Sequence, residues 1–234
     1  MEKSTPVFLF AMEKEATPLL KASTVLSKRR SGFATIYECL YDNISYSIVI
    51  SGIGKGFAAA AMTAIHYEFD HPEVFNFGVA GTLDDHLAPM LSAVISSSFV
   101  EHDLDTSQIG DPVGLVSGIN RIDLPASPQL MARVSNACKQ VNISCALGKI
   151  SSGDTFFAPN DPRKKEAIDR FHPLSIDMES APFAQIAFVY QIPFVAVRLI
   201  SDAHHPETEY VENMGRCAEN IYRIACKVLL SYAQ

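Results

Sequence analysis

Four charged residues lie within or at the ends of apolar segments, where an unpaired charge is costly. They are Glu15, Glu179, Arg198 and Asp202. Arg198 is the clearest anomaly, because it lies inside the apolar run 194–200 and must meet a carboxylate or an anionic ligand there. Asp202 follows on the same face of an extended strand, at most roughly 13 Å away, so one small ligand could contact both. A structural ion pair is the alternative for Arg198.

Two glycine-containing segments follow predicted strands and would bring the backbone close to a ligand. Residues 51–55 read SGIGK, and residues 78–81 read GVAG. SGIGK is not a phosphate loop of the GxxxxGK(S/T) type, because Gly56 follows the lysine. It is not a GxGxxG dinucleotide loop either, because Phe57 occupies the place of the third glycine. A tight turn without a ligand is the alternative for both segments.

Carboxylates also precede two predicted helices. Glu15 lies in AMEKE, one helical turn beyond Met12, so both side chains can face the same cleft. Asp177 and Glu179 alternate along SIDMES, and a carboxylate can accept hydrogen bonds from both hydroxyls of a ribose. Helix-start and capping acids are the alternative interpretation of all three residues.

The elements that must position these residues alternate between apolar strands and amphipathic helices. Strands are expected over residues 7–12, 35–40, 45–50, 74–77, 91–98, 145–151 and 193–201. Helices are expected over residues 13–26, 55–69, 128–141, 179–190 and 212–232. The pattern predicts a single α/β domain, residues 1–234, with a central mixed, twisted β-sheet flanked by helices. Ligands of such sheets bind at the carboxyl ends of the strands, where the polar segments accumulate.

Composition narrows the possible functions. The 234 residues include 19 Lys plus Arg and 26 Asp plus Glu, a net charge of −7, and 48% of them are apolar. This excludes a disordered chain, and the short basic runs make a nucleic-acid partner unexpected. No apolar run approaches the ~18 residues of a membrane span. Five dispersed cysteines without metal-ligand spacing indicate reduced thiols and no metal site, as in a cytoplasmic protein.

Seven segments, taken in order, resemble the nucleoside phosphorylase/nucleosidase superfamily, and most closely the 5'-methylthioadenosine/S-adenosylhomocysteine nucleosidase family. They are AMEKE, SGIGK, FGVAG, HDLDTSQIG, SSGDTFF, DMES and VRLISD, and they span nearly the whole chain. The resemblance implies a small nucleoside substrate, water as the nucleophile, no cofactor, no metal ion and a homodimer.

The resemblance also implies roles for the charged residues. Asp202 matches the acid that contacts purine N7 and the exocyclic amine. Glu15 matches the carboxylate that holds the attacking water, and Arg198 would lie beside that water. Glu179 matches the carboxylate that binds the ribose 2'- and 3'-hydroxyls, with Met178 packing beneath the sugar.

Apolar and aromatic positions complete the implied site. Phe156 matches the residue that stacks on the purine, and Phe157 the one whose backbone contacts it. Met12, Ile53 and Tyr210 resemble parts of the pocket for the 5'-substituent of the nucleoside.

Four further positions bear on the resemblance. Val79 stands where these nucleosidases usually carry serine, which removes one hydroxyl near the ribose. Thr106 and Ile109 match residues that reach the neighbouring subunit's pocket. Asp111 stands where an aromatic or apolar residue often lines the 5' pocket, and would favour a more polar 5' group if it faced the cavity.

Cleavage of an N-ribosyl bond requires protonation of the purine and attack of water at the anomeric carbon, which two carboxylates can provide. The sequence thus predicts a hydrolase of 5'-modified adenosines. Methylthioadenosine, adenosylhomocysteine, 5'-deoxyadenosine and aminodeoxyfutalosine are the candidate substrates. A phosphorylase on the same fold is the first alternative, although a single arginine and the repulsive charge of Glu15 favour water over phosphate. A non-catalytic nucleoside-binding protein is the second alternative.

Overall fold

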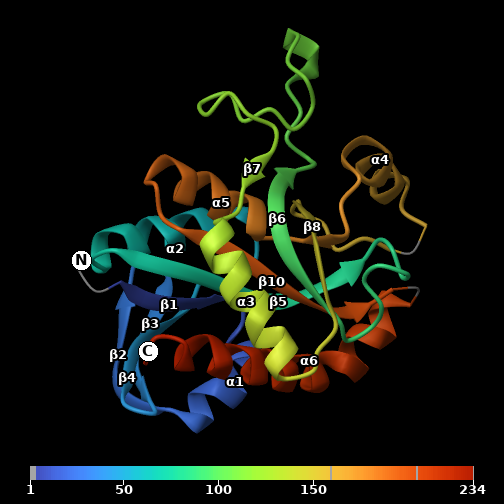
Figure 1. Cartoon of the computed structure of the whole chain (residues 1–234). Coiled ribbons are helices and arrows are strands. Elements are labelled where there is room, and N and C mark those ends of the chain that lie inside the picture. Colours follow the sequence, from blue (N-terminus) through green and yellow to red (C-terminus); the bar gives the residue numbers. More distant parts are fainter. Residues whose placement is uncertain (1–3, 159, 204, 234) are drawn as a thin grey trace.

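The computed structural model describes residues 4–158, 160–203 and 205–233, and its strands form one mixed sheet with helices packed against it (Figure 1). The longer strands are β1 (Thr5–Phe10), β2 (Thr24–Ser31), β3 (Ala34–Tyr41), β4 (Ile44–Ile50), β5 (Pro72–Thr82), β6 (Ala93–Glu101), β8 (Cys145–Ser152) and β10 (Phe194–Asp202). The short strands are β7 (Leu124–Pro125) and β9 (Ser175–Asp177). The helices are α1 (Glu13–Ala22), α2 (Lys55–Glu68), α3 (Pro128–Gln140), α4 (Pro162–Phe171), α5 (Ser180–Val189), α6 (Pro206–Leu230) and the 3-10 turn η1 (Ser107–Ile109).

Strand β5 is the centre of the sheet. It pairs in parallel with β1 and with β10, and its last residues pair antiparallel with β9. Strands β10, β6, β8 and β9 then follow one another, so that part of the sheet closes back on β5. The carboxyl ends of β1, β5 and β10 therefore lie together at one edge of the sheet.

Side chains that alternate along the strands build a separate core on each face of the sheet. Phe8 and Phe10 of β1 pack on the face covered by α1, α3 and α6, where Phe8 contacts Phe75 and Phe77 edge to face. Val7 and Leu9, which alternate with these phenylalanines along β1, pack on the face covered by α2 and α5. Burial on both faces explains the continuous apolar runs, and the α/β fold with a mixed, helix-flanked sheet is confirmed.

The strands predicted over residues 35–40 and 45–50 are present as β3 and β4, but the helix predicted before them extends too far. Strands β3 and β4 pair antiparallel across Asp42 and Asn43, whose φ angles of 47° and 62° suit a two-residue turn. The helix expected over residues 13–26 ends at Ala22, and residues 24–31 form β2 instead. Strand β2 lies at the sheet edge with mostly exposed side chains, so no burial pattern marked it in the sequence.

The structure differs from the predicted elements in two further helices, and one long connecting segment stands out. Helix α6 begins at Pro206, six residues before the predicted start at 212. Helix α4 was not predicted, although Asp161 caps it by accepting from the backbone of Arg163 and Pro162 opens it. The segment between β6 and β7 projects from the rest of the molecule (Figure 1). None of the helices in the described ranges is long and apolar enough to cross a bilayer.

Candidate active site

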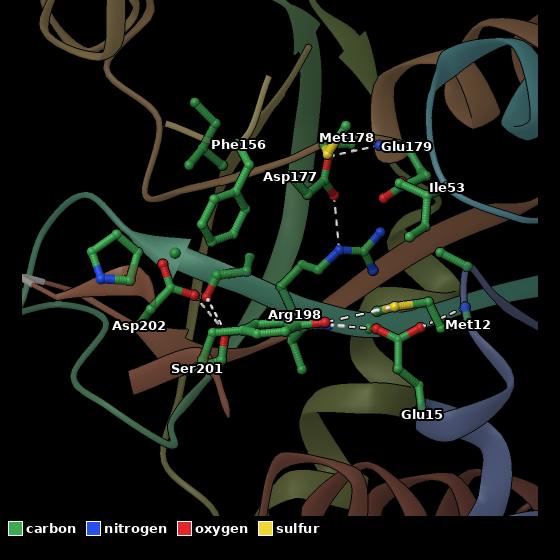
Figure 2. A pocket seen from close by; sticks show the side chains of 18 of the residues that line it. Met12, Glu15, Ile53, Phe156, Asp177, Met178, Glu179, Arg198, Ser201 and Asp202 are labelled. Carbon is green, nitrogen blue, oxygen red and sulfur yellow. Dashed lines mark hydrogen bonds and ion pairs between the residues drawn. The ribbon is translucent and has the colours of Figure 1, made fainter. Parts of the chain in front are cut away.

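A cavity of about 430 Å³ opens where β1, β5 and β10 end, a volume in the usual range for small-molecule sites. It is lined by Ala11, Met12, Glu15, Ile53, Phe77, Gly78, Val79, Ala80, Gly81, Phe156, Ile176, Asp177, Met178, Glu179, Arg198, Ser201, Asp202, Pro206, Glu207 and Tyr210. Figure 2 shows Asp202 and Phe156 at one end and Glu15, Met12, Ile53 and Glu179 at the other, with Arg198 between them.

Glu15 lies in the first turn of α1, where the backbone holds both of its carboxylate oxygens. Oε2 accepts from the amide of Met12 at 2.9 Å, the usual reach of a glutamate back to the start of its helix. Oε1 accepts from the amide of Val79 on β5 at 3.2 Å. The side chain is buried, which raises the pKa of the carboxyl against the opposing effects of these amides and of Arg198. A fixed, desolvated carboxylate of this kind can act as a general base.

Arg198 is fully buried on β10 and meets a carboxylate. Its Nε donates to Oδ2 of Asp177 at 2.8 Å, and its Nη atoms donate to the carbonyl and side-chain oxygens of Asn76. The ion pair considered as the alternative is therefore present, while the guanidinium also lines the cavity. Asn76 was not singled out, although an asparagine between two phenylalanines of a buried strand was an available signal.

Asp177 and Glu179 have different environments. Asp177 accepts from the hydroxyls of Ser152 and Ser180 in addition to Arg198, so neighbours occupy its oxygens. Within the described residues, the side chain of Glu179 accepts a single hydrogen bond, to Oε1 from the amide of Gly54 at 2.8 Å. Burial, then the nearby Asp177, raise the pKa of Glu179 to about 8. Glu179 is thus the carboxylate of the pair that can bind a ligand.

Asp202 ends β10 at the opposite end of the cavity. Its Oδ1 accepts from the hydroxyl of Ser201 at 2.6 Å, and Oδ2 lies only 2.8 Å from where a Cβ at Gly81 would be. Any side chain at position 81 would displace the carboxyl group, which explains the second glycine of GVAG. Burial raises the pKa of Asp202, so its neutral, proton-donating form persists to higher pH than that of an ordinary aspartate.

The apolar residues form the walls. Phe156 and Ile53 are 59% and 51% exposed and stand at the rim. Tyr210, on the first turns of α6, accepts from Lys14 Nζ at 2.7 Å and lies 3.6 Å from the sulfur of Met12. The cavity lining also includes Met178 and Val79 as predicted, and Ser201, Pro206 and Glu207, which the sequence did not suggest.

Some predicted residues do not line this cavity. The ring of Phe157 is buried against His102 and Arg163, outside the cavity, and the predicted role of its backbone stays a prediction. Ile109 is 82% exposed on the projecting segment. Asp111 accepts from Thr106 Oγ1 at 3.0 Å on that segment, so it does not face its own chain's cavity. Within the described ranges, no three His, Cys, Asp or Glu side chains gather as metal ligands would.

Comparison with known proteins extends this description. The model of the phosphorylase superfamily matches residues 6–230. The chain belongs to this superfamily. A 5'-methylthioadenosine/S-adenosylhomocysteine nucleosidase of Staphylococcus aureus (strain JH9) is 30% identical over 199 residues, 85% of this chain and 86% of the relative. This superfamily member is accordingly one of the nucleosidases, and an N-ribosyl hydrolase, as the resemblance implied.

Solved structures of similar fold agree with that placement. A 5'-methylthioadenosine/S-adenosylhomocysteine nucleosidase from Neisseria meningitidis, in complex with methylthio-immucillin-A, is 26% identical with a TM-score of 0.90 over 97% of this chain and 99% of the other. One from Colwellia psychrerythraea, in complex with adenine, is 27% identical with a TM-score of 0.89 over 97% and 95%. A futalosine hydrolase of Helicobacter pylori, 24% identical with a TM-score of 0.90 over 97% and 98%, shares the fold.

Proposed function

We propose that this nucleosidase hydrolyses the N-ribosyl bond of 5'-modified adenosines, releasing adenine and a 5'-modified ribose. The observation that carries the proposal is the pair of buried carboxyl groups, Asp202 and Glu15, at opposite ends of one cavity (Figure 2). Hydrolysis with inversion uses one carboxyl group as the acid on the leaving group and another as the base for water.

Asp202 is the proposed acid for the purine. Its hydrogen bond from Ser201 holds Oδ1, and the residue lines the cavity, where its carboxyl group can donate a proton to purine N7. Protonation at N7 lets adenine leave as a neutral molecule instead of an anion. The raised pKa supports this role, because a general acid must hold its proton near neutral pH. Phe156, at the same end, provides a face on which the purine stacks.

Glu15 is the proposed base. Water held by its carboxylate attacks C1' as the bond to the purine breaks, and the carboxylate takes the proton that the water releases. Arg198 opposes the effect of burial on the pKa of Glu15 and so favours the carboxylate form that a base requires. The positive charge that develops on the ribose is stabilised by the negative charge of Glu15, and by that of Glu179 at pH values above its raised pKa.

Glu179 and the apolar wall are the proposed determinants of sugar recognition. The carboxylate of Glu179 accepts from the 2'- and 3'-hydroxyls, with Met178 packed beneath the ring. Met12, Ile53 and Tyr210 then surround the 5'-substituent. Methylthioadenosine, adenosylhomocysteine, 5'-deoxyadenosine and aminodeoxyfutalosine stay the candidate substrates, because they differ at that substituent.

We further propose a cytoplasmic homodimer. The five cysteines, all in the described part of the chain, are free thiols, as a reducing compartment favours. The exposed Ile109 on the projecting segment provides an apolar surface that a second copy would cover. Light scattering after size exclusion measures the oligomeric state, and a monomer at micromolar concentration would contradict this part of the proposal.

Phosphorolysis is the competing reaction. Arg198, the cationic side chain in the cavity lining, already donates to Asp177 and Asn76, and Glu15 would repel a phosphate ion. Assaying adenine release from the four nucleosides, with and without phosphate, tests the proposal. We expect phosphate-independent release of adenine and a free 5'-modified ribose. Strict dependence on phosphate, with a ribose 1-phosphate product, would establish a phosphorylase, and no release from any of them would favour a non-catalytic binding protein.

A further inference from the structure

Four charged residues that the proposed mechanism does not use, Lys55, Glu101, Asp103 and Asp154, form hydrogen bonds around the start of α2. Lys55 begins α2, and its Nζ donates to Oε1 of Glu101 and to Oδ1 of Asp103, both at 2.8 Å. Asp103 lies just beyond the end of β6, and Asp154 lies in the loop after β8. Lys55, Asp103 and Asp154 come from the segments SGIGK, HDLDTSQIG and SSGDTFF, whose charged residues had no assigned role.

Asp154 joins these groups through the backbone. Its Oδ1 accepts from the amide of Lys55 at 2.9 Å, and its own amide donates to Oδ2 of Asp103 at 3.0 Å. Asp103 thus bridges the side chain of Lys55 and the backbone of Asp154. The result is a closed set of hydrogen bonds between the start of α2 and the loop after β8.

The same stretch of backbone reaches Glu179. The amide of Gly54, directly before Lys55, donates to Oε1 of Glu179 at 2.8 Å. Gly54 has φ +96°, which other residues adopt only with strain, and Oδ1 of Asp154 lies 3.1 Å from where its Cβ would be. Two successive amides therefore point at two carboxylates, Gly54 at Glu179 and Lys55 at Asp154.

We propose that Lys55, Asp103 and Asp154 are positioning residues that hold the Gly54 amide against Glu179 and so orient its free oxygen toward the ribose hydroxyls. None of the three is among the described residues that line the cavity, so they act on the substrate through Glu179. The inference rests on the proposed function. It adds one requirement: the loss of activity on substitution of Lys55, Asp103 or Asp154 must depend on the hydroxyls that Glu179 binds.

A purely structural role of these residues predicts an equal loss of activity on all substrates. Lys55 and Asp103 are partly exposed and Asp154 is exposed, and ion pairs of that kind contribute little to stability. If they mattered for stability alone, their loss would affect all substrates equally. A positioning role predicts a loss that is selective for substrates carrying the 2'- and 3'-hydroxyls.

The test compares Asp154→Ala with wild type on 5'-deoxyadenosine and on 2',3',5'-trideoxyadenosine, which lacks both hydroxyls that Glu179 binds. We expect kcat/KM for the first to fall on the order of 10-fold, as for loss of a hydrogen bond to a charged group, and for the second to change by less than about 2-fold. Asp154→Asn keeps an oxygen for the Lys55 amide and should retain most activity. Asp161→Ala is the matched control, since it removes a capping carboxylate from the same loop but contacts Arg163 instead.

Two more measurements distinguish loss of Glu179 positioning from a general loss of structure. In a Glu179→Gln background, Asp154→Ala should cause no further loss, because it acts through the missing carboxylate. The Gly54 amide lowers the pKa of Glu179, so Asp154→Ala should also move the acid side of the kcat/KM profile to higher pH. Equal losses on both nucleosides, additive losses with Glu179→Gln, or wild-type behaviour of Asp154→Ala would overturn the proposal.

Equilibrium binding distinguishes failure of this inference from failure of the proposed function. The affinities of adenosine and 2',3'-dideoxyadenosine give the same comparison without turnover. If the wild type hydrolyses none of the nucleosides, the proposed function is wrong, while a selective loss of adenosine binding in Asp154→Ala still supports the positioning role. If binding of both nucleosides falls equally, the positioning role is wrong whatever the turnover.

Discussion

Glu15 and Arg198 approach each other over Gly78. A Cβ at position 78 would lie 3.2 Å from Oε1 of Glu15 and 3.3 Å from Nη1 of Arg198. The two charged side chains come from the first turn of α1, which follows β1, and from β10, and β5 brings them together because it pairs with β1 and β10. The first glycine of GVAG thus leaves the space in which the proposed base and its neighbouring cation meet.

Gly78→Ala should therefore reduce turnover while leaving the fold intact. The added methyl group must push Glu15 or Arg198 by a few tenths of an ångström, which misplaces the proposed water-holding carboxylate. We expect kcat to fall on the order of 10-fold with an unchanged circular dichroism spectrum. Gly215→Ala on α6, where a Cβ meets nothing within 4 Å, is the control and should keep full activity. Normal turnover in Gly78→Ala would argue against a fixed Glu15 as the base.

Asp202→Asn should keep the fold and lose activity. Asparagine preserves the size and the hydrogen bond from Ser201, but it cannot donate an acidic proton to N7. Turnover should fall by a factor of roughly 10² or more, with nucleoside affinity less affected. Adenine release and equilibrium binding measure the two effects. Turnover like that of the wild type would remove Asp202 as the acid.

Glu179→Gln should stabilise the protein more at high pH than at low pH. In the folded state the carboxyl group keeps its proton up to a pKa of about 8, against 4.5 as the ordinary value. Wild-type stability therefore falls as pH rises through this window, because the folded state binds the extra proton. The difference in unfolding free energy, variant minus wild type, should grow by about 1 kcal/mol or more between pH 5 and pH 8. Urea titrations at both pH values measure it.

The exposed Glu212→Gln on α6 is the control for loss of one surface charge in this comparison. If the difference between Glu179→Gln and wild type stays constant from pH 5 to pH 8, Glu179 is not a buried acid with a raised pKa.

Arg198→Met should destabilise the fold strongly. It would leave the carboxylate of Asp177 buried without its cation, a change that costs about 3 kcal/mol or more. Asp177→Asn removes that uncompensated charge, so the double variant should be more stable than Arg198→Met alone. Urea unfolding of the two single variants and the double variant gives the coupling energy. Independent, additive effects would show that the pair contributes nothing as a pair.

The sequence predicted much of the site because its charged residues were exceptions to local rules. Arg198 and Asp202 stood out in an apolar strand, and both line the cavity. The resemblance assigned Glu179 to the ribose, but the partner of Arg198 needed the structure, since only the pairing of β9 and β10 with β5 brings Asp177 to it. The sequence could not predict roles for Lys55 and Asp154 either, because the contact between them joins residues about a hundred positions apart.

Errors in the predicted fold have a similar physical origin. Strand β2 is an exposed edge and carries no alternation of buried and exposed residues that periodicity could detect. Strand β9 has three residues and is held by its neighbours β5 and β8, not by its own propensity. Periodic burial reveals elements that have one face in a core. Strands β2 and β9 form instead because they pair with neighbouring strands.

The cavity lining runs from Ala11 to Tyr210, and it draws on strands, turns and the two helices α1 and α6. No short fragment holds a complete site, so full affinity for ligand requires that α1, β5, β10 and α6 have assembled. A bound nucleoside then acts as a non-covalent cross-link between the two halves of the polypeptide. Its binding free energy adds to the free energy of global unfolding, so saturation with ligand protects against proteolysis the segments that open only when the whole molecule unfolds.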